Sequence, residues 1–445
     1  LHCFDAVTGE ELWGFIPYNL LPKLKNMWPV DAATGDRYFA RDEYVDGSPV
    51  SADVYIDADG NGSREWRTIL VCGQGPGEGS SIAGGLNYYF ALDVTDPYDP
   101  QPLWEFTHKR LGETWSIPVI GKIVKSGSDT WVAFTGSGYD NNPDRRTGNR
   151  FYAVDLETGD QFWKYKATEV NTKNVHGFSW NIKNTLPGSP SLVDIDQNGH
   201  VDRVYFADLD GRVYRLDASI EYRTQGRRRT TWDNAVEVIY EDANNYPIIT
   251  RPAVWVNATS MSPVPRVYFG TGGDDVAPAD TTYSFVAVLD SSSPEVEWYI
   301  GDSALLNLDP AKDMGDLALG EKVWADPAVA NNIVYFSTLT GNIEAVDPCS
   351  NLAGVGKLYA RFVQAVAGSA IGSTALRSAS GNIQSLDLAS KTRSAVTLGE
   401  TERVQGSRKR EVYIQEYDST VQKLEQPVGA VLKVKSWREI YKVIR

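Results

Sequence analysis

The chain has 445 residues and a formal net charge of −15, with 13 Trp and 23 Tyr but only 3 Met. This acidity argues against a nucleic-acid-binding protein, because phosphate backbones are held by lysine and arginine. Frequent Gly, Pro and aromatic residues favour short strands joined by tight turns over long helices. The three cysteines, Cys3, Cys72 and Cys349, are odd in number and match no zinc spacing. We find no signal peptide and no apolar run long enough to span a bilayer.

An internal repeat runs through the chain. Each copy is a short apolar strand that ends in Asp, then a turn, and often an aromatic strand. The terminal aspartates are Asp5, Asp93, Asp155, Asp217, Asp290, Asp347 and Asp387. A second strand, which runs into a Gly-rich turn, precedes several copies, as in RVYFADLDG and RVYFGTGGDD. Repeated four-stranded sheets of this kind predict an all-β chain that closes into a β-propeller.

We expect residues 1–445 to form a single β-propeller domain with seven blades and long inter-strand insertions. Eight blades are an open alternative, because the late segment VYIQEYDSTVQKLE repeats the hairpin once more. Residues 395–445 are expected to supply ring-closing strands and a C-terminal tail. Because the chain opens on LHCFDAVTGEELW, which already has the pattern of a strand, we expect it to be a fragment of a larger protein.

The first candidate metal loop, residues 57–65, carries oxygen donors at alternate positions and then enters a strand. Its donors are Asp57, Asp59, Asn61, Ser63 and Glu65. Arg64 and Arg67 lie close in sequence and offer a way to neutralise these carboxylates without a metal. We therefore treat this loop as the second and weaker candidate for Ca²⁺, with an ion-free loop as the alternative.

The primary candidate is the loop 194–202. Its donors are Asp194, Asp196, Asn198, His200 by its backbone carbonyl, and Asp202. Oxygens at positions 1, 3, 5, 7 and 9 suit Ca²⁺, and a glycine at position 6 permits the sharp turn. The loop lacks the position-12 Glu of an EF-hand and leads into a strand. A solvated acidic turn is the alternative, since Asp, Asn and Gly are common turn formers, but three carboxylates at period two repel one another without a cation.

Signatures of enzymes are absent from the sequence, which contains no HExxH, GxSxG, P-loop or CxxC motif. Four tryptophans occupy the same place in the repeat: Trp13, Trp104, Trp163 and Trp298. A residue that recurs at one place in every repeat is expected to pack repeat against repeat, so we predict contacts between blades.

Much of the chain resembles the PilC/PilY family, tip-associated adhesins of the type IV pilus that also support pilus assembly. The resemblance rests on LHCFDAVTGEELWGFIPYNLLPKL, YVDGSPVSADVY, YYFALDVTDP, WSIPVIGKI, FTGSGYDNN, LVDIDQNGHVDRVYFADLDGRVYRLD, RVYFGTGGDD and SWREIYKVIR, in that order. It implies a C-terminal propeller with a calcium loop at Asp194, Asp196, Asn198 and Asp202. Asn198 stands where the family usually has Asp, which removes one charge and should weaken affinity. The Arg-Gly-Asp motif of some members is absent.

The resemblance implies a non-enzymatic, calcium-binding propeller that acts in pilus assembly, in the balance of extension and retraction, and in surface adhesion. The implied partners are minor pilins or other pilus-tip components and a host or abiotic surface, with no nucleic acid. The implied location is extracellular, at the pilus tip, after export through the periplasm. An alternative is a quinone-dependent dehydrogenase, because AVDLETGDQFW resembles the tryptophan-containing repeat of quinoprotein propellers. The chain lacks the adjacent Cys-Cys pair that many such enzymes place over the cofactor.

Overall fold

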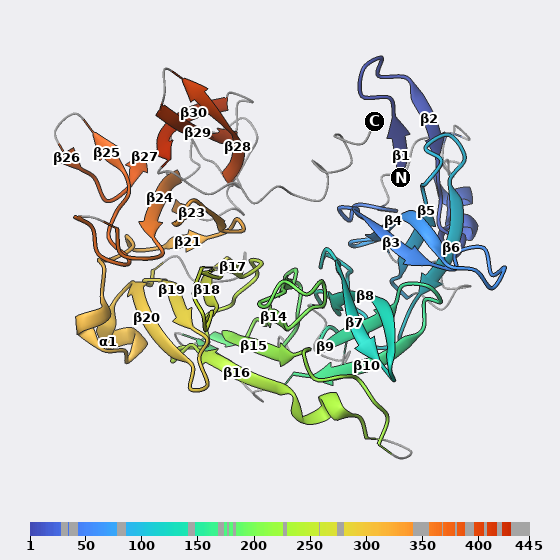
Figure 1. Cartoon of the computed structure of the whole chain (residues 1–445), viewed down its shortest axis with the longest axis horizontal. Coiled ribbons are helices and arrows are strands. Elements are labelled where there is room, and N and C mark those ends of the chain that lie inside the picture. The colour runs from blue at the N-terminus through green and yellow to red at the C-terminus, as the bar shows by residue number, and fades with distance from the viewer. Residues whose placement is uncertain are drawn as a thin grey trace.

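The structure is a computed structural model, in which the strands follow one another around a ring in chain order (Figure 1). The described residues are 1–27, 34, 43–77, 86–140, 147–167, 173–175, 178–180, 184–225, 229–257, 259–273, 280–340, 356–366, 368–378, 381–387, 396–404, 407–415 and 421–428. Helical segments in this part of the chain are short: η1 (Tyr18–Asn26), η3 (Thr231–Asn234), α1 (Ser303–Leu306) and η4 (Pro310–Lys312). The predicted all-β propeller is therefore confirmed, and the described helices include none long and apolar enough to cross a membrane.

Four sheets are antiparallel blades in which consecutive strands are neighbours. The first blade contains β3 (Val50–Ile56), β4 (Glu65–Gly73), β5 (Tyr89–Asp93) and β6 (Gln101–Phe106). The second contains β7 (Val119–Lys125), β8 (Ser128–Gly136), β9 (Arg150–Asp155) and β10 (Gln161–Lys166). The third contains β13 (Ser191–Val193), β14 (Arg203–Ala207), β15 (Arg212–Asp217) and β16 (Val236–Glu241). The fourth contains β17 (Ala253–Trp255), β18 (Arg266–Gly270), β19 (Phe285–Leu289) and β20 (Glu295–Ile300).

The fifth blade has an extra strand, since both β21 and β22 pair with β23. It contains β21 (Glu321–Val323), β22 (Ala328–Ala330), β23 (Ile333–Thr340), β24 (Gly356–Phe362) and β27 (Leu386–Asp387). Two small hairpins stand outside the blades: β11 (Lys173–Val175) with β12 (Phe178–Trp180), and β25 (Arg377–Ser378) with β26 (Gly381–Asn382).

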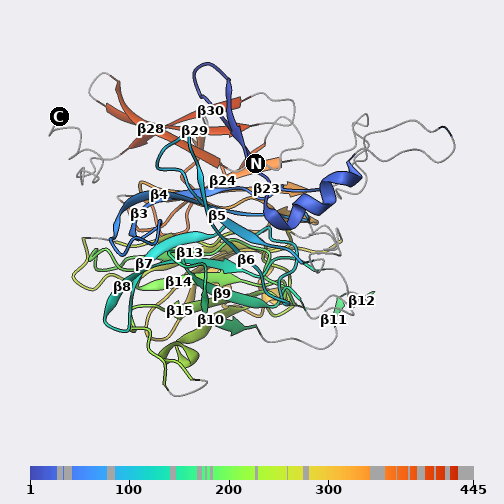
Figure 2. The same cartoon turned by 90° about the vertical axis from the view of Figure 1, so that its right-hand side faces the viewer.

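The ends of the chain form two further sheets on the same side of the molecule in both views (Figures 1 and 2). One is the hairpin β1 (His2–Phe4) and β2 (Glu11–Gly14). The other contains β28 (Val396–Val404), β29 (Ser407–Gln415) and β30 (Val421–Val428). Among the described strands these two sheets pair only internally, and residues 429–445 of the expected tail lie outside the described part. Ring closure, the single domain and the count of seven blades stay predictions.

In the first four blades the sequence repeat corresponds to the inner strands, whereas in the fifth blade Asp387 ends the edge strand β27, and Asp347 lies outside the described residues. The strand that ends in Asp is the third strand, as at Asp93, Asp155 and Asp217. The strand that runs into a Gly-rich turn is the second, as in β8, β14 and β18. The first strands of the third, fourth and fifth blades have 3 residues each, which is too short for alternation to identify them.

Stacked aromatic rings join neighbouring blades in the core. Phe151 of β9 lies face to face with Phe206 of β14, with ring centroids 3.9 Å apart. Phe285 of β19 and Phe336 of β23 stack in the same way at 3.6 Å. All four residues are buried, so each pair fills the interface between consecutive blades with apolar surface.

The repeated tryptophans also contact the following blade. Trp13 of β2 donates Nε1 to the Pro97 carbonyl at 2.9 Å, and Trp104 of β6 donates to the Leu156 carbonyl at 2.9 Å. Trp163 of β10 packs edge to face on Trp232, with centroids 5.4 Å apart. The prediction that this residue packs blade against blade is confirmed at these positions.

Candidate metal centre

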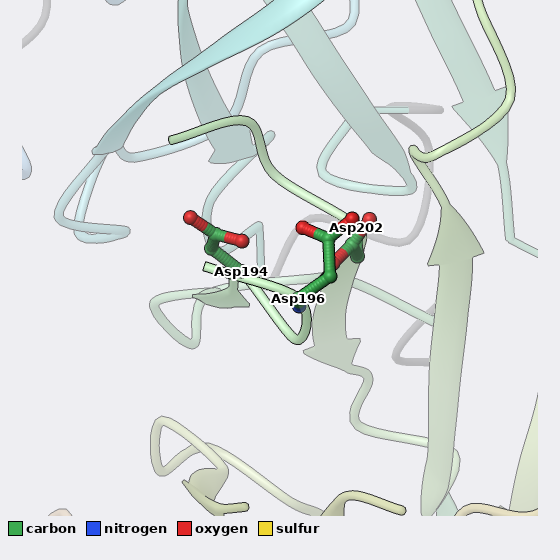
Figure 3. A group of neighbouring side chains, drawn as sticks. All are labelled: Asp194, Asp196 and Asp202. Carbon is green, nitrogen blue, oxygen red and sulfur yellow. The ribbon is translucent and has the colours of Figure 1, made fainter. Parts of the chain in front are cut away.

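The loop 194–202 connects β13 to β14 and brings three carboxylates together. Oxygens of Asp194, Asp196 and Asp202 all lie within 4.8 Å of one another. Figure 3 shows the three side chains gathered at the same loop. In the part of the chain that the structure describes, these three aspartates are the one group of three or more His, Cys, Asp or Glu side chains that lie close enough together to share a metal ion.

Backbone hydrogen bonds give the loop its tight curvature. The Asp194 carboxylate accepts from Asn198 N at 3.1 Å and from Gly199 N at 2.7 Å. Gln197 and Gly199 have φ values of 60° and 86°, so the chain takes left-handed conformations at positions 4 and 6. With these turns the carboxylate oxygens of Asp194, Asp196 and Asp202 lie within 4.8 Å of one another.

Asp202 closes the loop on its own beginning. Its Oδ2 accepts from Ile195 N at 2.6 Å and from Asp196 N at 3.3 Å. Because Asp202 directly precedes β14, the loop fixes the start of the second strand of the third blade.

Asn198 and His200 complete the set of predicted donors. The Asn198 amide donates Nδ2 to Asp196 Oδ2 at 2.9 Å, and its Oδ1 accepts from His200 N at 2.7 Å. His200 Nε2 lies 2.9 Å from Asp129 Oδ1 of the second blade, and this hydrogen bond, followed by the contact with Lys122, lowers the pKa of Asp129.

The second loop, 57–65, connects β3 to β4 at the equivalent place in the first blade. Asp57 accepts from Asn61 N at 3.0 Å and from Gly62 N at 2.8 Å. Asn61 donates Nδ2 to Asp59 at 3.0 Å and accepts from Ser63 N at 2.7 Å. At positions 1, 3, 5, 6 and 7 the hydrogen bonds thus repeat those of the loop 194–202. The two loops share one backbone conformation.

The two loops differ at position 9. Glu65 forms an ion pair with Arg67, which also lies 3.5 Å from Asp59 Oδ2 and 3.3 Å from Asp93 Oδ2. Arg67 therefore neutralises carboxylates of this loop, as expected for the ion-free alternative given in the sequence analysis. Metal binding by Asp57, Asp59, Asn61, Ser63 and Glu65 stays a prediction.

The donor set at 194–202 fits a calcium ion chemically. Carboxylate, amide and carbonyl oxygens are hard ligands, which Ca²⁺ prefers to nitrogen and sulfur ligands. Asp194 and Asp202 are half-buried and Asp196 is exposed, so the group is open to solvent on one side. Asp129 and Lys122, which flank the loop, are contacts that sequence reasoning missed. Asp129 lies 71 residues before His200 and belongs to no recognisable motif.

Comparison with known proteins assigns the chain to a family. The family model described as the PilY1 beta-propeller domain matches residues 24–274, which include both loops and the first three blades. The chain belongs to the PilY1 β-propeller family.

Relatives and a solved structure agree with the family assignment. The chain is 32% identical over 220 residues to the type IV pilus biogenesis factor PilY1 of Pseudomonas aeruginosa strain UCBPP-PA14, a match that covers 49% of this chain. It is 29% identical over 282 residues to a PilY1 homolog of Xylella fastidiosa, which covers 61% of this chain. The matches span 16% and 18% of the length of these two relatives. The crystal structure of the P. aeruginosa PilY1 C-terminal domain has the same fold, with a TM-score of 0.58, 21% identity, and coverage of 93% of this chain and 88% of that chain.

Proposed function

We propose that this propeller is the calcium-binding part of a type IV pilus biogenesis factor, and that it acts in pilus assembly and surface adhesion without enzymatic activity. Membership of the PilY1 β-propeller family carries the proposal. Relatives in two organisms are named as type IV pilus biogenesis factors or their homologs. Neither they nor the solved neighbour are named as quinone-dependent dehydrogenases, so that alternative gains no support from them.

Partners and location follow from this proposal. A pilus biogenesis factor acts where the fibre is built, so minor pilins or other tip components are the expected partners. The location is the cell surface at the pilus tip, reached by export through the periplasm. A host or abiotic surface is the expected target of adhesion.

Calcium supplies the regulatory element. Asp194, Asp196 and Asp202 would hold the ion through carboxylate oxygens, Asn198 through its amide oxygen, and His200 through its backbone carbonyl. Bound calcium compensates the mutual repulsion of three carboxylates whose oxygens lie within 4.8 Å. Because Asp202 leads directly into β14, occupancy would fix the start of the second strand of the third blade. We infer that this change alters how the propeller engages pilus components, so that occupancy tunes extension against retraction.

The experiment compares Asp196→Ala with Asp99→Ala. Asp99 is an exposed residue in the turn between β5 and β6 of the first blade, so Asp99→Ala removes the same charge outside both loops. The chain 1–445 should gain melting temperature as Ca²⁺ is added, because an ion that binds only the folded state stabilises it by mass action. We expect Asp196→Ala to lose the gain that comes from this loop and Asp99→Ala to keep it. Asp59→Ala is added to remove any contribution of the loop 57–65.

A second arm tests the biological part. A strain that lacks its own copy is complemented with the full-length gene carrying Asp196→Ala or Asp99→Ala, and pilus number, twitching and attachment are measured with and without Ca²⁺. We expect calcium-dependent surface piliation with the control variant only. If Asp59→Ala/Asp196→Ala still gains stability from Ca²⁺ as the parent does, neither loop is the site. If piliation does not depend on the gene, the pilus function is wrong.

A further inference from the structure

One residue of the second blade contacts both loops. Asp129 lies at the start of β8, just after the turn in which Ser126 and Gly127 take φ values of 51° and 83°. Its Oδ1 lies 2.9 Å from His200 Nε2, and its Oδ2 lies 3.1 Å from Lys122 Nζ. Its backbone carbonyl accepts from Arg64 Nη1 of the loop 57–65 at 3.1 Å. Asp129 therefore joins outer turns of three consecutive blades.

The loop 194–202 also rests on the backbone of the second blade. Val201 N donates to the Lys122 carbonyl at 2.8 Å. A Cβ atom at Gly121 would lie 2.4 Å from Val201 Cγ2 and 3.0 Å from Leu192 Cδ2, so a glycine there permits the close approach. The end of the loop is thus held from outside by the neighbouring sheet.

The His200 ring transmits this contact to two predicted donors. Its Nδ1 lies 3.1 Å from Asn198 Oδ1, while Nε2 faces Asp129. His200 N also donates to Asn198 Oδ1 at 2.7 Å. The ring orientation therefore sets both the Asn198 amide at position 5 and the His200 peptide at position 7.

We propose that Asp129 is a positioning residue for calcium binding at the loop 194–202. It acts from the neighbouring blade through His200, and it holds two donors in the arrangement that an ion needs. This inference rests on the calcium-binding function proposed above. Side chains that orient metal ligands typically contribute about 10- to 100-fold to affinity, although they never touch the ion.

The negative charge of Asp129 and its contact with His200 can be tested separately. Asp129→Ala removes both the carboxylate and the acceptor for His200. Asp129→Asn keeps an acceptor oxygen but removes the charge, which Lys122 already offsets at 3.1 Å. We therefore expect the contact with His200 to contribute more to calcium affinity than the charge of Asp129 does. The conservative variant Asp129→Asn should then retain calcium binding.

The test measures calcium affinity of the chain 1–445 by calorimetric titration, with Asp59→Ala in every protein to silence the loop 57–65. We expect Asp129→Ala to weaken affinity about 10-fold relative to Asp99→Ala, and Asp129→Asn to stay within about 3-fold of it. The melting temperature in EDTA should be nearly the same for all three, which separates loss of ligand positioning from loss of folding.

His200→Ala supplies a second, independent measure. If Asp129 acts through His200, the double variant Asp129→Ala/His200→Ala binds no more weakly than His200→Ala alone. Additive losses would overturn the proposal, as would equal affinities of Asp129→Ala and Asp99→Ala while Asp196→Ala abolishes binding. The calcium function would survive both of these results. Absence of calcium binding in the protein with Asp59→Ala alone would remove calcium binding at the loop 194–202, and the inference with it, but would leave the family-based pilus function in place.

Discussion

Gly159 tests the packing of the first blade against the second. It lies in the turn between β9 and β10, with a φ of 76°. A Cβ atom at this position would lie 2.6 Å from Cγ and 2.7 Å from Cβ of Trp104. Trp104 is held in place by its hydrogen bond to the Leu156 carbonyl at 2.9 Å. Gly159→Ala therefore combines backbone strain with a collision against a fixed ring.

The backbone strain and the collision differ in size, and a second glycine provides a matched control for the strain. A non-glycine residue in the left-handed region costs about 1–2 kcal/mol. Overpacking a well-filled contact adds about 1–3 kcal/mol, so we expect Gly159→Ala to lower the free energy of unfolding by roughly 2–5 kcal/mol. Gly127, in the same blade, has a φ of 83° and nothing within 4 Å of an added Cβ. Gly127→Ala should therefore show the strain alone.

Urea denaturation followed by tryptophan fluorescence gives both values from the change in midpoint at constant slope. In a Trp104→Gly background both the ring and the Cβ atom of residue 104 are gone, so Gly159→Ala should cost only about as much as Gly127→Ala. Equal destabilisation by the two glycine substitutions in the parent would refute the packing argument. So would a Gly159→Ala effect that is the same with and without Trp104.

Two further predictions address pH and cofactor chemistry. Burial raises the pKa of the Asp208 carboxyl from 3.8 to about 6, so the folded state holds a proton that the unfolded state releases as the pH rises through this window. The parent should therefore lose stability relative to Asp208→Asn between about pH 4 and 6, by at most about 3 kcal/mol, and parallel urea midpoints across this range would contradict the assignment. Incubation with pyrroloquinoline quinone and Ca²⁺ should leave no bound chromophore and no alcohol-dependent dye reduction, whereas stoichiometric retention of quinone would overturn the non-enzymatic function.

The sequence by itself determined the features that depend on neighbouring residues in the chain. Alternating apolar residues and terminal Asp or Gly identified the second and third strands of the blades, because strand and turn preferences are local. The alternate oxygens of 57–65 and 194–202 predicted two loops of one shape, and the hydrogen bonds confirm that shape. The tryptophan that recurs in the repeat predicted contacts between blades, because a residue at the same place in each repeat meets the same part of the neighbouring repeat.

Only the tertiary structure decided how these segments meet. Strands of 3 residues, such as β13, carry too little pattern to be recognised alone, and they form because a neighbouring strand supplies their hydrogen bonds. The sequence suggested two similar metal loops, but the fold clusters Asp202 with its partners and places Glu65 beside Arg67. Asp129 reaches His200 across 71 residues because the second blade stacks against the third. The stacking of blades is set by the packing of whole sheets, and no local stretch of the chain records which side chains that packing brings together.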